Sequence, residues 1–266
     1  MQRAKIDPRI TSNQVDSGLV AKSQEDTGPD ALKEMLTAGT FDFLDFGCSK
    51  GASLRFGMKK LRGRRGLGID IDAGKVKKTR QAGFEACQAD IRGLDAHPDC
   101  VDFVVMSHFL EHLPSLSDAD ACIRTACTAA RRFVFIRQPW FDSDGYLFAK
   151  NLKFYWSDWD GHPNAMTSLQ LYRCLCQVGK ASRFRIYGKD RVWRSDDRAI
   201  IPLSAPSNSH EWDPARHGKR LSMDFETPIY REVAAFVAFG DANLDDMEIR
   251  VDNLERIFDS EDTADE

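Results

Sequence analysis

The segment Phe41–Gly51 constrains the fold of this chain more than any other part of the sequence. Its residues, FDFLDFGCSKG, are an apolar run that meets an acid, Asp45, and then a turn containing Gly47 and Gly51. An apolar strand that ends in a glycine turn is typical of open α/β sheets, because glycine lets the main chain approach a ligand closely. The segment therefore predicts the first strand of such a sheet, followed by a helix from Ala52 onward.

The spacing of this turn indicates what kind of ligand it can hold. Asp-x-Gly-x-x-x-Gly differs from the Gly-x-Gly-x-x-Gly pattern that places a pyrophosphate on a helix N-terminus. Asp45 lies where an anionic phosphate would be repelled. We therefore expect the part of the ligand that faces the turn to carry positive charge. A nicotinamide enzyme, the nearest alternative for such a sheet, is disfavoured because the three-glycine pattern is missing.

Short apolar runs alternate with helical segments along the rest of the chain, which predicts a parallel sheet with crossover helices. The near-continuous apolar run in the fourth of these strands indicates burial on both faces. Thr167 and Gln170 have the capping-box spacing of a helix start. We expect strands at Phe41–Phe46, Gly66–Ile71, Glu85–Asp90, Val101–Ser107, Arg132–Arg137, Arg183–Tyr187 and Glu232–Phe239.

Periodicity and composition divide the chain into an arm, a domain and a tail. Residues 1–28 are polar and aperiodic, which predicts a flexible N-terminal arm. Residues 29–240 have the length of an ordinary α/β domain, with insertions expected at 138–166 and 189–229. Residues 241–266 form an acidic C-terminal tail, in which we expect one weak helix through Met247, Val251, Leu254 and Ile257.

Charge and cysteine usage exclude several classes of protein. The formal net charge of −4 argues against a nucleic-acid partner, and the basic run Lys59–Arg65 is expected to be a solvated helix end and loop. The seven cysteines are scattered without a Cys-x-x-Cys motif, which argues against a disulfide framework or a zinc site. The polar segment Met1–Asp30 is neither a signal peptide nor a membrane span, so a cytoplasmic location is the default expectation.

Three acids close successive expected strands: Asp45, Asp70 and Asp90. In a doubly wound sheet they would lie at the carboxyl edge, near the point where the strand order reverses and ligands bind. Asp70, roughly 20 residues past the glycine turn, is placed to accept hydrogen bonds from both hydroxyls of a ribose. Asp90 is placed to accept from an adenine amino group, with the Ile91 amide serving a ring nitrogen. Asp45 would supply negative potential for an ammonium group.

These segments resemble the class I, Rossmann-like S-adenosylmethionine-dependent methyltransferases, in their small-molecule branch. The strings that carry the resemblance are Leu44–Gly51, Gly68–Ile71, Ala89–Ile91 and Val105–Leu113. It implies a mostly parallel, doubly wound sheet of about seven strands with helices on both faces. It also implies S-adenosyl-L-methionine as cofactor and S-adenosyl-L-homocysteine as product. The cofactor-binding residues that it implies are Asp45, Gly47, Cys48, Ser49, Gly51, Asp70, Ile71, Asp90, Ile91, Ser107 and His108.

One residue departs from the pattern of this family. Ser49 occupies a turn position at which many members have glycine. A small residue still permits close approach of the main chain, and the hydroxyl could reach the cofactor carboxylate. In the family, the turn holds the methionine part of the cofactor, the second-strand acid holds the ribose and the third-strand acid holds the adenine.

The reaction implied is direct displacement, in which a nucleophile attacks the sulfonium methyl and a neutral thioether leaves. An oxygen acceptor needs a base within hydrogen-bond reach, and the candidate catalytic residues are His108, His112 and His162. The alternatives are that His112 shapes the cofactor wall and that His162 is a structural loop residue. Asp158, Asp160 and His162 are spaced too loosely for a metal site, and no metal is expected.

Residues 140–162 concentrate aromatic side chains between Asp and Asn rather than between Lys and Arg. This composition favours a wall for a polar organic acceptor. No Asn-Pro-Pro-Tyr motif follows the fourth strand, which argues against methylation of a base amine. We expect O-methylation of a small molecule or of a glycan or lipid-linked sugar. A transferase for RNA or protein, for which Lys59–Arg65 would be the feature, and a non-catalytic cofactor-binding module stay open as alternatives, as does the oligomeric state.

Overall fold

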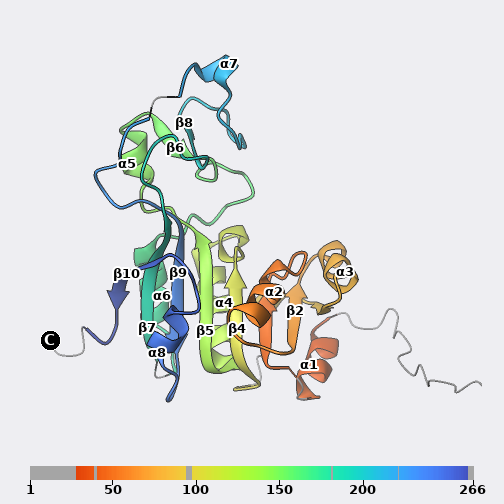
Figure 1. Cartoon of the computed structure of the whole chain (residues 1–266). Coiled ribbons are helices and arrows are strands. Elements are labelled where there is room, and N and C mark those ends of the chain that lie inside the picture. The colour runs from red at the N-terminus through yellow and green to blue at the C-terminus, as the bar shows by residue number, and fades with distance from the viewer. Residues whose placement is uncertain (1–27, 39–40, 94–97, 181, 221, 263–266) are drawn as a thin grey trace, which may run out of the picture.

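The central sheet of the protein has eight strands, five of them parallel to one another and three added at one side in antiparallel pairings (Figure 1). A computed structural model describes residues 28–38, 41–93, 98–180, 182–220 and 222–262 of the 266. The central strands are β1 (Phe43–Phe46), β2 (Gly66–Asp70), β3 (Glu85–Gln88), β4 (Val101–Ser107), β5 (Ala130–Pro139), β7 (Arg183–Arg191), β9 (Tyr230–Ala238) and β10 (Leu254–Asp259). They lie in the order β10-β7-β9-β5-β4-β1-β2-β3.

The strand directions determine where the functional edge lies. Strands β3, β2, β1, β4 and β5 pair in parallel, so their carboxyl ends meet at one edge. Strand β9 is antiparallel to both β5 and β7, and β10 is antiparallel to β7. The chain runs out from β1 in both directions, to β2 and to β4, which makes the ends of β1 and β4 the switch point where such sheets bind ligands.

Helices cover both faces of the sheet, as the sequence predicts. The helices are α1 (Pro29–Thr37), α2 (Ala52–Lys59), α3 (Ala73–Gln81), α4 (Leu116–Ala129), α5 (Asp144–Phe148), α6 (Ser168–Cys176), α7 (Pro214–His217) and α8 (Leu244–Glu248), with short 3₁₀ turns η1 (Ile91–Gly93) and η2 (Leu110–His112). Buried residues of α1, α4 and α6 pack with Leu44 and Phe46 on one face. Those of α2, α3 and α8 pack with Phe43 and Phe103 on the other.

Local sequence signals account for several element boundaries. The Thr167 hydroxyl accepts a hydrogen bond from the Gln170 amide, and the Gln170 side chain accepts one from the Thr167 amide. The predicted capping box is therefore present at the start of α6. Ser115 caps α4 in a similar way by accepting from the Asp118 amide. Strand β4 has the predicted bounds, and six of its seven residues are buried.

The two predicted insertions meet in a small cap that stands above the carboxyl edge of β4 and β5 (Figure 1). Strand β6 (Leu152–Phe154) from the first insertion pairs antiparallel with β8 (Ile200–Pro202) from the second. Helices α5 and α7 belong to the same cap. Segments about 50 residues apart thus form one structural unit beside the site.

The acidic tail differs from its prediction. The weak helix expected through Met247, Val251, Leu254 and Ile257 is wrong, because the chain forms α8 and then the edge strand β10. Leu244 and Met247 of α8 are buried, and backbone pairing to β7 determines the conformation of β10. The predicted arm, residues 1–28, lies outside the described residues except for Gly28. Among the described residues, no helix combines the length and the apolar run that crossing a membrane requires.

Candidate active site

A cavity of about 300 Å³ opens at the carboxyl ends of β1 to β4. Each loop that follows one of these strands contributes to its wall, which is why residues scattered over the sequence meet here. The lining residues are Gly47, Ser49, Asp70, Ile71, Lys75, Ala89, Asp90, Ile91, Arg92, His108, Phe109, His112, Leu113 and Pro114. We call this the smaller cavity.

The glycine turn after β1 requires its glycines. Gly47 and Gly51 have φ values of 75° and 83°, in the left-handed region. A Cβ atom on Gly47 would lie 2.5 Å from Phe109 Cδ2, and one on Gly51 would lie 2.7 Å from Phe84 Cδ2. Ser49 also has a positive φ, 48°, and its amide donates a hydrogen bond to Asp70 Oδ2 at 3.0 Å. The turn and the second acid are therefore held together before any ligand binds.

Asp70 and Asp90 both line the smaller cavity, but they have different hydrogen-bond partners. Asp70 is 4% exposed and accepts from the amides of Ser49 and Asp72, which fixes its carboxylate while each oxygen keeps a further lone pair. Asp90 is bound by its neighbour, with Arg92 Nη2 donating to Asp90 Oδ2 at 2.7 Å. That hydrogen bond keeps the pKa of Asp90 below its usual value.

Asp45 lies beneath the turn and does not line the cavity. Its side chain is fully buried, Ser53 Oγ donates to Oδ2 at 2.5 Å, and Oδ1 has no hydrogen-bond partner among the described residues. Burial raises the pKa of Asp45 to about 7, opposed by the Ser53 hydrogen bond and reinforced by the charge of Asp70. Three other residues named from the sequence, Cys48, Gly51 and Ser107, also lie outside the lining.

The loop after β4 carries His108 in a strained conformation, with φ at 53°. Both ring nitrogens are engaged: Nε2 lies 2.7 Å from Glu232 Oε1, and Nδ1 lies 3.3 Å from Glu111 Oε1. Burial would lower the pKa of His108, but the hydrogen bonds and charges of Glu111 and Glu232 outweigh it and raise the pKa to about 9. The same contact shifts the pKa of Glu232 in the opposite direction. Burial would raise its pKa, but the His108 hydrogen bond and nearby cations lower it to about 2.

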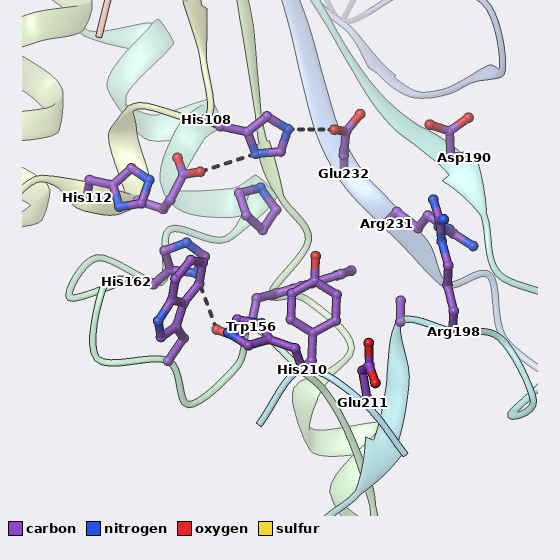
Figure 2. Close-up of a pocket in the computed structure, with 15 residues that line it drawn as sticks. His108, His112, Trp156, His162, Asp190, Arg198, His210, Glu211, Arg231 and Glu232 are labelled. Atoms are coloured by element: carbon purple, nitrogen blue, oxygen red, sulfur yellow. Dashed lines mark hydrogen bonds and ion pairs between the residues drawn. The ribbon is translucent and has the colours of Figure 1, made fainter. Parts of the chain in front are cut away.

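A second cavity, of about 740 Å³, lies between the sheet edge and the cap (Figure 2). We call this the larger cavity. His108 and His112 line both cavities, so they form the boundary between them. The remaining lining residues are Glu111, Pro139, Tyr155, Trp156, Trp159, His162, Asp190, Arg198, Ala199, His210, Glu211, Arg231 and Glu232.

The family description "Methyltransferase domain" matches residues 44–132 of the chain. Every residue that lines the smaller cavity falls within that range. The part of the chain that forms the smaller cavity is therefore similar to a methyltransferase domain. No curated protein matches the sequence closely enough to count as a relative.

Solved structures with a similar arrangement are distant in sequence. A possible histamine N-methyltransferase from Thermotoga maritima is 12% identical, with 75% of this chain and 83% of that one covered and a TM-score of 0.48. A magnesium protoporphyrin IX methyltransferase from Synechocystis PCC 6803, with bound S-adenosylhomocysteine, is 15% identical over 79% and 81%, with a TM-score of 0.46. A methyltransferase from Archaeoglobus fulgidus is 16% identical over 79% and 94%, with a TM-score of 0.48.

The smaller cavity suits S-adenosylmethionine chemically. Gly47 lines the cavity with main chain alone, and a Cβ atom there would collide with Phe109. The carboxylate of Asp70 lines the same cavity. The turn offers no phosphate-binding pattern, and the carboxylates of Asp70 and Asp90 on the cavity wall match a positively charged ligand. These features accommodate an adenosyl sulfonium rather than a dinucleotide.

His112 and His162 meet at the floor of the larger cavity, with ring centroids 5.0 Å apart. His112 Nδ1 donates to the Gly161 carbonyl at 2.7 Å. His162 Nδ1 lies 3.4 Å from the Trp156 carbonyl (Figure 2). Burial lowers the pKa of His162. All three histidines proposed from the sequence thus border the larger cavity.

Asp158 and Asp160 do not join His162. Asp158 pairs with Lys153, and Asp160 accepts a hydrogen bond from the Asn208 side chain. The loose trio considered from the sequence is therefore not assembled. His162 instead lies beside Glu111 and His112, a grouping that the sequence analysis did not consider although two of its members are adjacent in the chain.

Sequence reasoning also missed Glu111, Glu232, Arg198 and Arg231. Glu111 had a detectable signal, since it lies three residues after His108 in a turn already singled out. The other three come from β9 and from the loop before β8 and had no local signal. Arg231 Nη2 donates to both carboxylate oxygens of Asp197, at 2.9 and 2.7 Å, which fixes this wall of the cavity.

The basic run Lys59–Arg65 lies at the end of α2, before β2, and thus at the edge of the sheet opposite to the cavities. Its cations are largely paired with acids. Lys60 contacts Asp252 at 2.7 Å, and Arg65 contacts Glu85 at 2.6 Å. The run does not extend the wall of either cavity.

Proposed function

We propose that this protein is an S-adenosylmethionine-dependent methyltransferase that methylates an oxygen atom of a small molecule, or of a glycan or lipid-linked sugar, bound in the larger cavity. The observation that carries the proposal is the boundary between the two cavities, which consists of His108 and His112. A cofactor in the smaller cavity and an acceptor in the larger one would meet at these side chains. Such a shared boundary is what alignment of two reactants for direct displacement requires.

The residues of the smaller cavity have separate binding roles in this proposal. Asp70 accepts hydrogen bonds from both ribose hydroxyls, because its carboxylate is already oriented by two amides. Asp90 and the Ile91 amide serve the adenine, and the turn from Gly47 to Ser49 lies against the methionine part. S-adenosylmethionine supplies a methyl group on a positively charged sulfur, which leaves as a neutral thioether.

The larger cavity has the lining of a site for a polar organic molecule. Tyr155, Trp156 and Trp159 provide aromatic surfaces in its lining. Carboxylates and guanidinium groups also line it, among them Glu211 and Arg198 (Figure 2). Aromatic faces with a few placed polar groups are typical of small-molecule sites, and a volume of about 740 Å³ fits a drug-sized acceptor. A nucleic-acid track would need a continuous basic wall, which these residues do not form.

A base among the histidines at the boundary, or beside them, has to accept the proton of an acceptor hydroxyl. Both ring nitrogens of His108 are occupied by carboxylates, so its role in this proposal is to position the boundary. His112 and His162 each donate Nδ1–H to a backbone carbonyl, which leaves the Nε2 lone pair for the acceptor side. We assign activation of the acceptor oxygen to these two residues together with Glu111.

Transfer of a labelled methyl group to a panel of acceptors tests this proposal. The panel should contain sugars, phenols, amines, carboxylates, RNA and protein, each incubated with the full chain and labelled S-adenosylmethionine. We expect label in an ether that survives alkaline hydrolysis. Label confined to nitrogen, RNA or protein would contradict the oxygen acceptor. Tight cofactor binding without transfer to any acceptor would favour the binding-module alternative.

A further inference from the structure

Three side chains at the floor of the larger cavity are arranged like metal ligands. One ligand-capable atom from each of Glu111, His112 and His162 lies within 4.8 Å of the other two. Two of these residues come from η2 and the third from the loop after β6, so the fold brings the group together. We propose that Glu111, His112 and His162 bind a divalent metal ion beside the acceptor, and that this ion is zinc. Binding of the metal is independent of the proposed function, but its role in activating the acceptor rests on that function.

Glu111 is the strongest single indication that this group binds a cation. Its side chain is 1% exposed, and Oε2 has no hydrogen-bond partner among the described residues. His108 Nδ1 lies 3.3 Å from the other oxygen, Oε1. A buried carboxylate with an open oxygen is costly unless it is paired or coordinates a metal. The group therefore contains an unsatisfied anionic ligand.

The two histidines have the outer hydrogen bonds that metal-binding imidazoles ordinarily have. A carbonyl oxygen can only accept, so His112 Nδ1 donates to Gly161 and His162 Nδ1 donates to Trp156. Both tautomers then carry the lone pair on Nε2. Metal-ligating histidines almost always donate their second N–H to a carboxylate, carbonyl or water, which orients the ring. The two loops thus present ligand nitrogens with a fixed tautomer.

The donor set selects the class of metal. Two imidazoles and one carboxylate suit zinc and its first-row neighbours, whereas magnesium and calcium prefer oxygen ligands. Ligand atoms around tetrahedral zinc lie about 3.3 Å apart, so the side chains would have to close by at most about 1.5 Å. Methyl transfer has no redox step, so a redox-inert ion is sufficient.

Three protein ligands leave a fourth coordination position, as in catalytic rather than structural zinc sites. All three residues line the larger cavity, so the open position faces the space assigned to the acceptor. A hydroxyl that binds there loses its proton at a lower pH than in water, and the proton passes to solvent in the cavity. The acceptor class that this arrangement favours is an alcohol or phenol that can reach the metal.

Metal titration of the chelator-treated full chain tests the inference directly. We expect one equivalent of Zn²⁺ by calorimetry, and an intense visible d–d absorption from Co²⁺ in place of Zn²⁺ that reports four- or five-coordinate geometry. The variants H112A, H162A and E111Q should each weaken metal binding by about 100-fold or more, since even loss of an outer hydrogen-bond partner costs about 10- to 100-fold. H210A, an exposed histidine in the same cavity, should retain it.

Circular dichroism of each variant shows whether it is folded, and His112 is exposed, so its removal leaves the core unchanged. Metal affinity that is unchanged in both H112A and H162A would overturn the site. Cofactor binding, measured on the same metal-free protein, separates the two proposals. If the cofactor binds and no metal does, the metal site alone is wrong. If the metal binds and no hydroxyl is methylated, the metal site stands and the oxygen acceptor is wrong.

Discussion

His108 Nε2 and Glu232 Oε1 lie 2.7 Å apart although 124 positions separate the two residues in the chain. The contact joins the loop after β4, which borders both cavities, to strand β9. Glu232 also lies 2.9 Å from Lys189 Nζ on β7. The boundary between the cavities is thus held by strands from the far half of the sheet, and its conformation depends on them.

Removal of the Glu232 carboxylate should destabilise the protein. Glu232→Ala leaves the exposed His108 and the largely covered Lys189 without their shared anion, and loss of such partly buried ion pairs costs about 2 kcal/mol in the free energy of unfolding. Glu232→Gln keeps the volume and one accepting oxygen, so its cost should be smaller. Urea unfolding measures both, with the exposed Glu226→Ala as a control expected to change the free energy of unfolding by less than about 0.5 kcal/mol.

Asp70→Ala should weaken cofactor binding by about 100-fold or more, because two hydrogen bonds to a charged acceptor are lost. Isothermal calorimetry with S-adenosylhomocysteine gives the affinity directly. Asp102→Ala is the matched control, since Asp102 lies at the start of β4 on the opposite edge and pairs with Arg131. Equal affinity in the Asp70 variant and the unchanged protein would contradict the assigned ribose contact.

Burial of Asp45 predicts a specific pH dependence of stability. Its pKa rises from 3.8 to about 7 on folding, so between about pH 4 and pH 7 the folded state holds a proton that the unfolded state has released. Stability from this group is therefore present below pH 4 and is lost as the pH rises to about 7. Asp45→Asn removes this loss, of the order of 4 kcal/mol.

The Asp45→Asn variant should thus gain stability relative to the unchanged protein as the pH rises from 4 to 7, and the difference should then stay constant. Urea unfolding at several pH values measures it. Ser53→Ala provides a second check, because the Ser53 hydroxyl donates to the ionised carboxylate and lowers its pKa. Its loss should extend the sloping region to higher pH. A pH-independent difference would show that Asp45 is ionised throughout.

Trp159→Ala should raise the KM for the acceptor by about tenfold and leave cofactor affinity unchanged. Trp159 lines only the larger cavity, and an aromatic contact contributes about 1 kcal/mol beyond its buried area. Trp193→Ala is the matched control, since Trp193 is 62% exposed and lies outside both cavities. A similar effect of both substitutions would mean that the aromatic wall does not contact the acceptor.

Prediction from sequence was most accurate where a local pattern reports the structure. Strand β2 ends one residue before its predicted limit, and β4 has its predicted bounds. The prediction failed at β10, where a weak helical period over Met247–Ile257 was overruled by backbone pairing with β7. It also did not show that β6 and β8 pair, because that register depends on contacts between two separate insertions.

By itself the sequence determined the parallel sheet, the glycine turn and the acids at the strand ends, because each of these follows from residues close together in the chain. The tertiary structure alone decided which of those acids face a cavity. Asp70 and Asp90 do, whereas Asp45 is buried beneath the turn. It also decided the acceptor side, where His162 meets Glu111 and His112. Such long-range packing of loops leaves no period or spacing in the sequence from which it could be read.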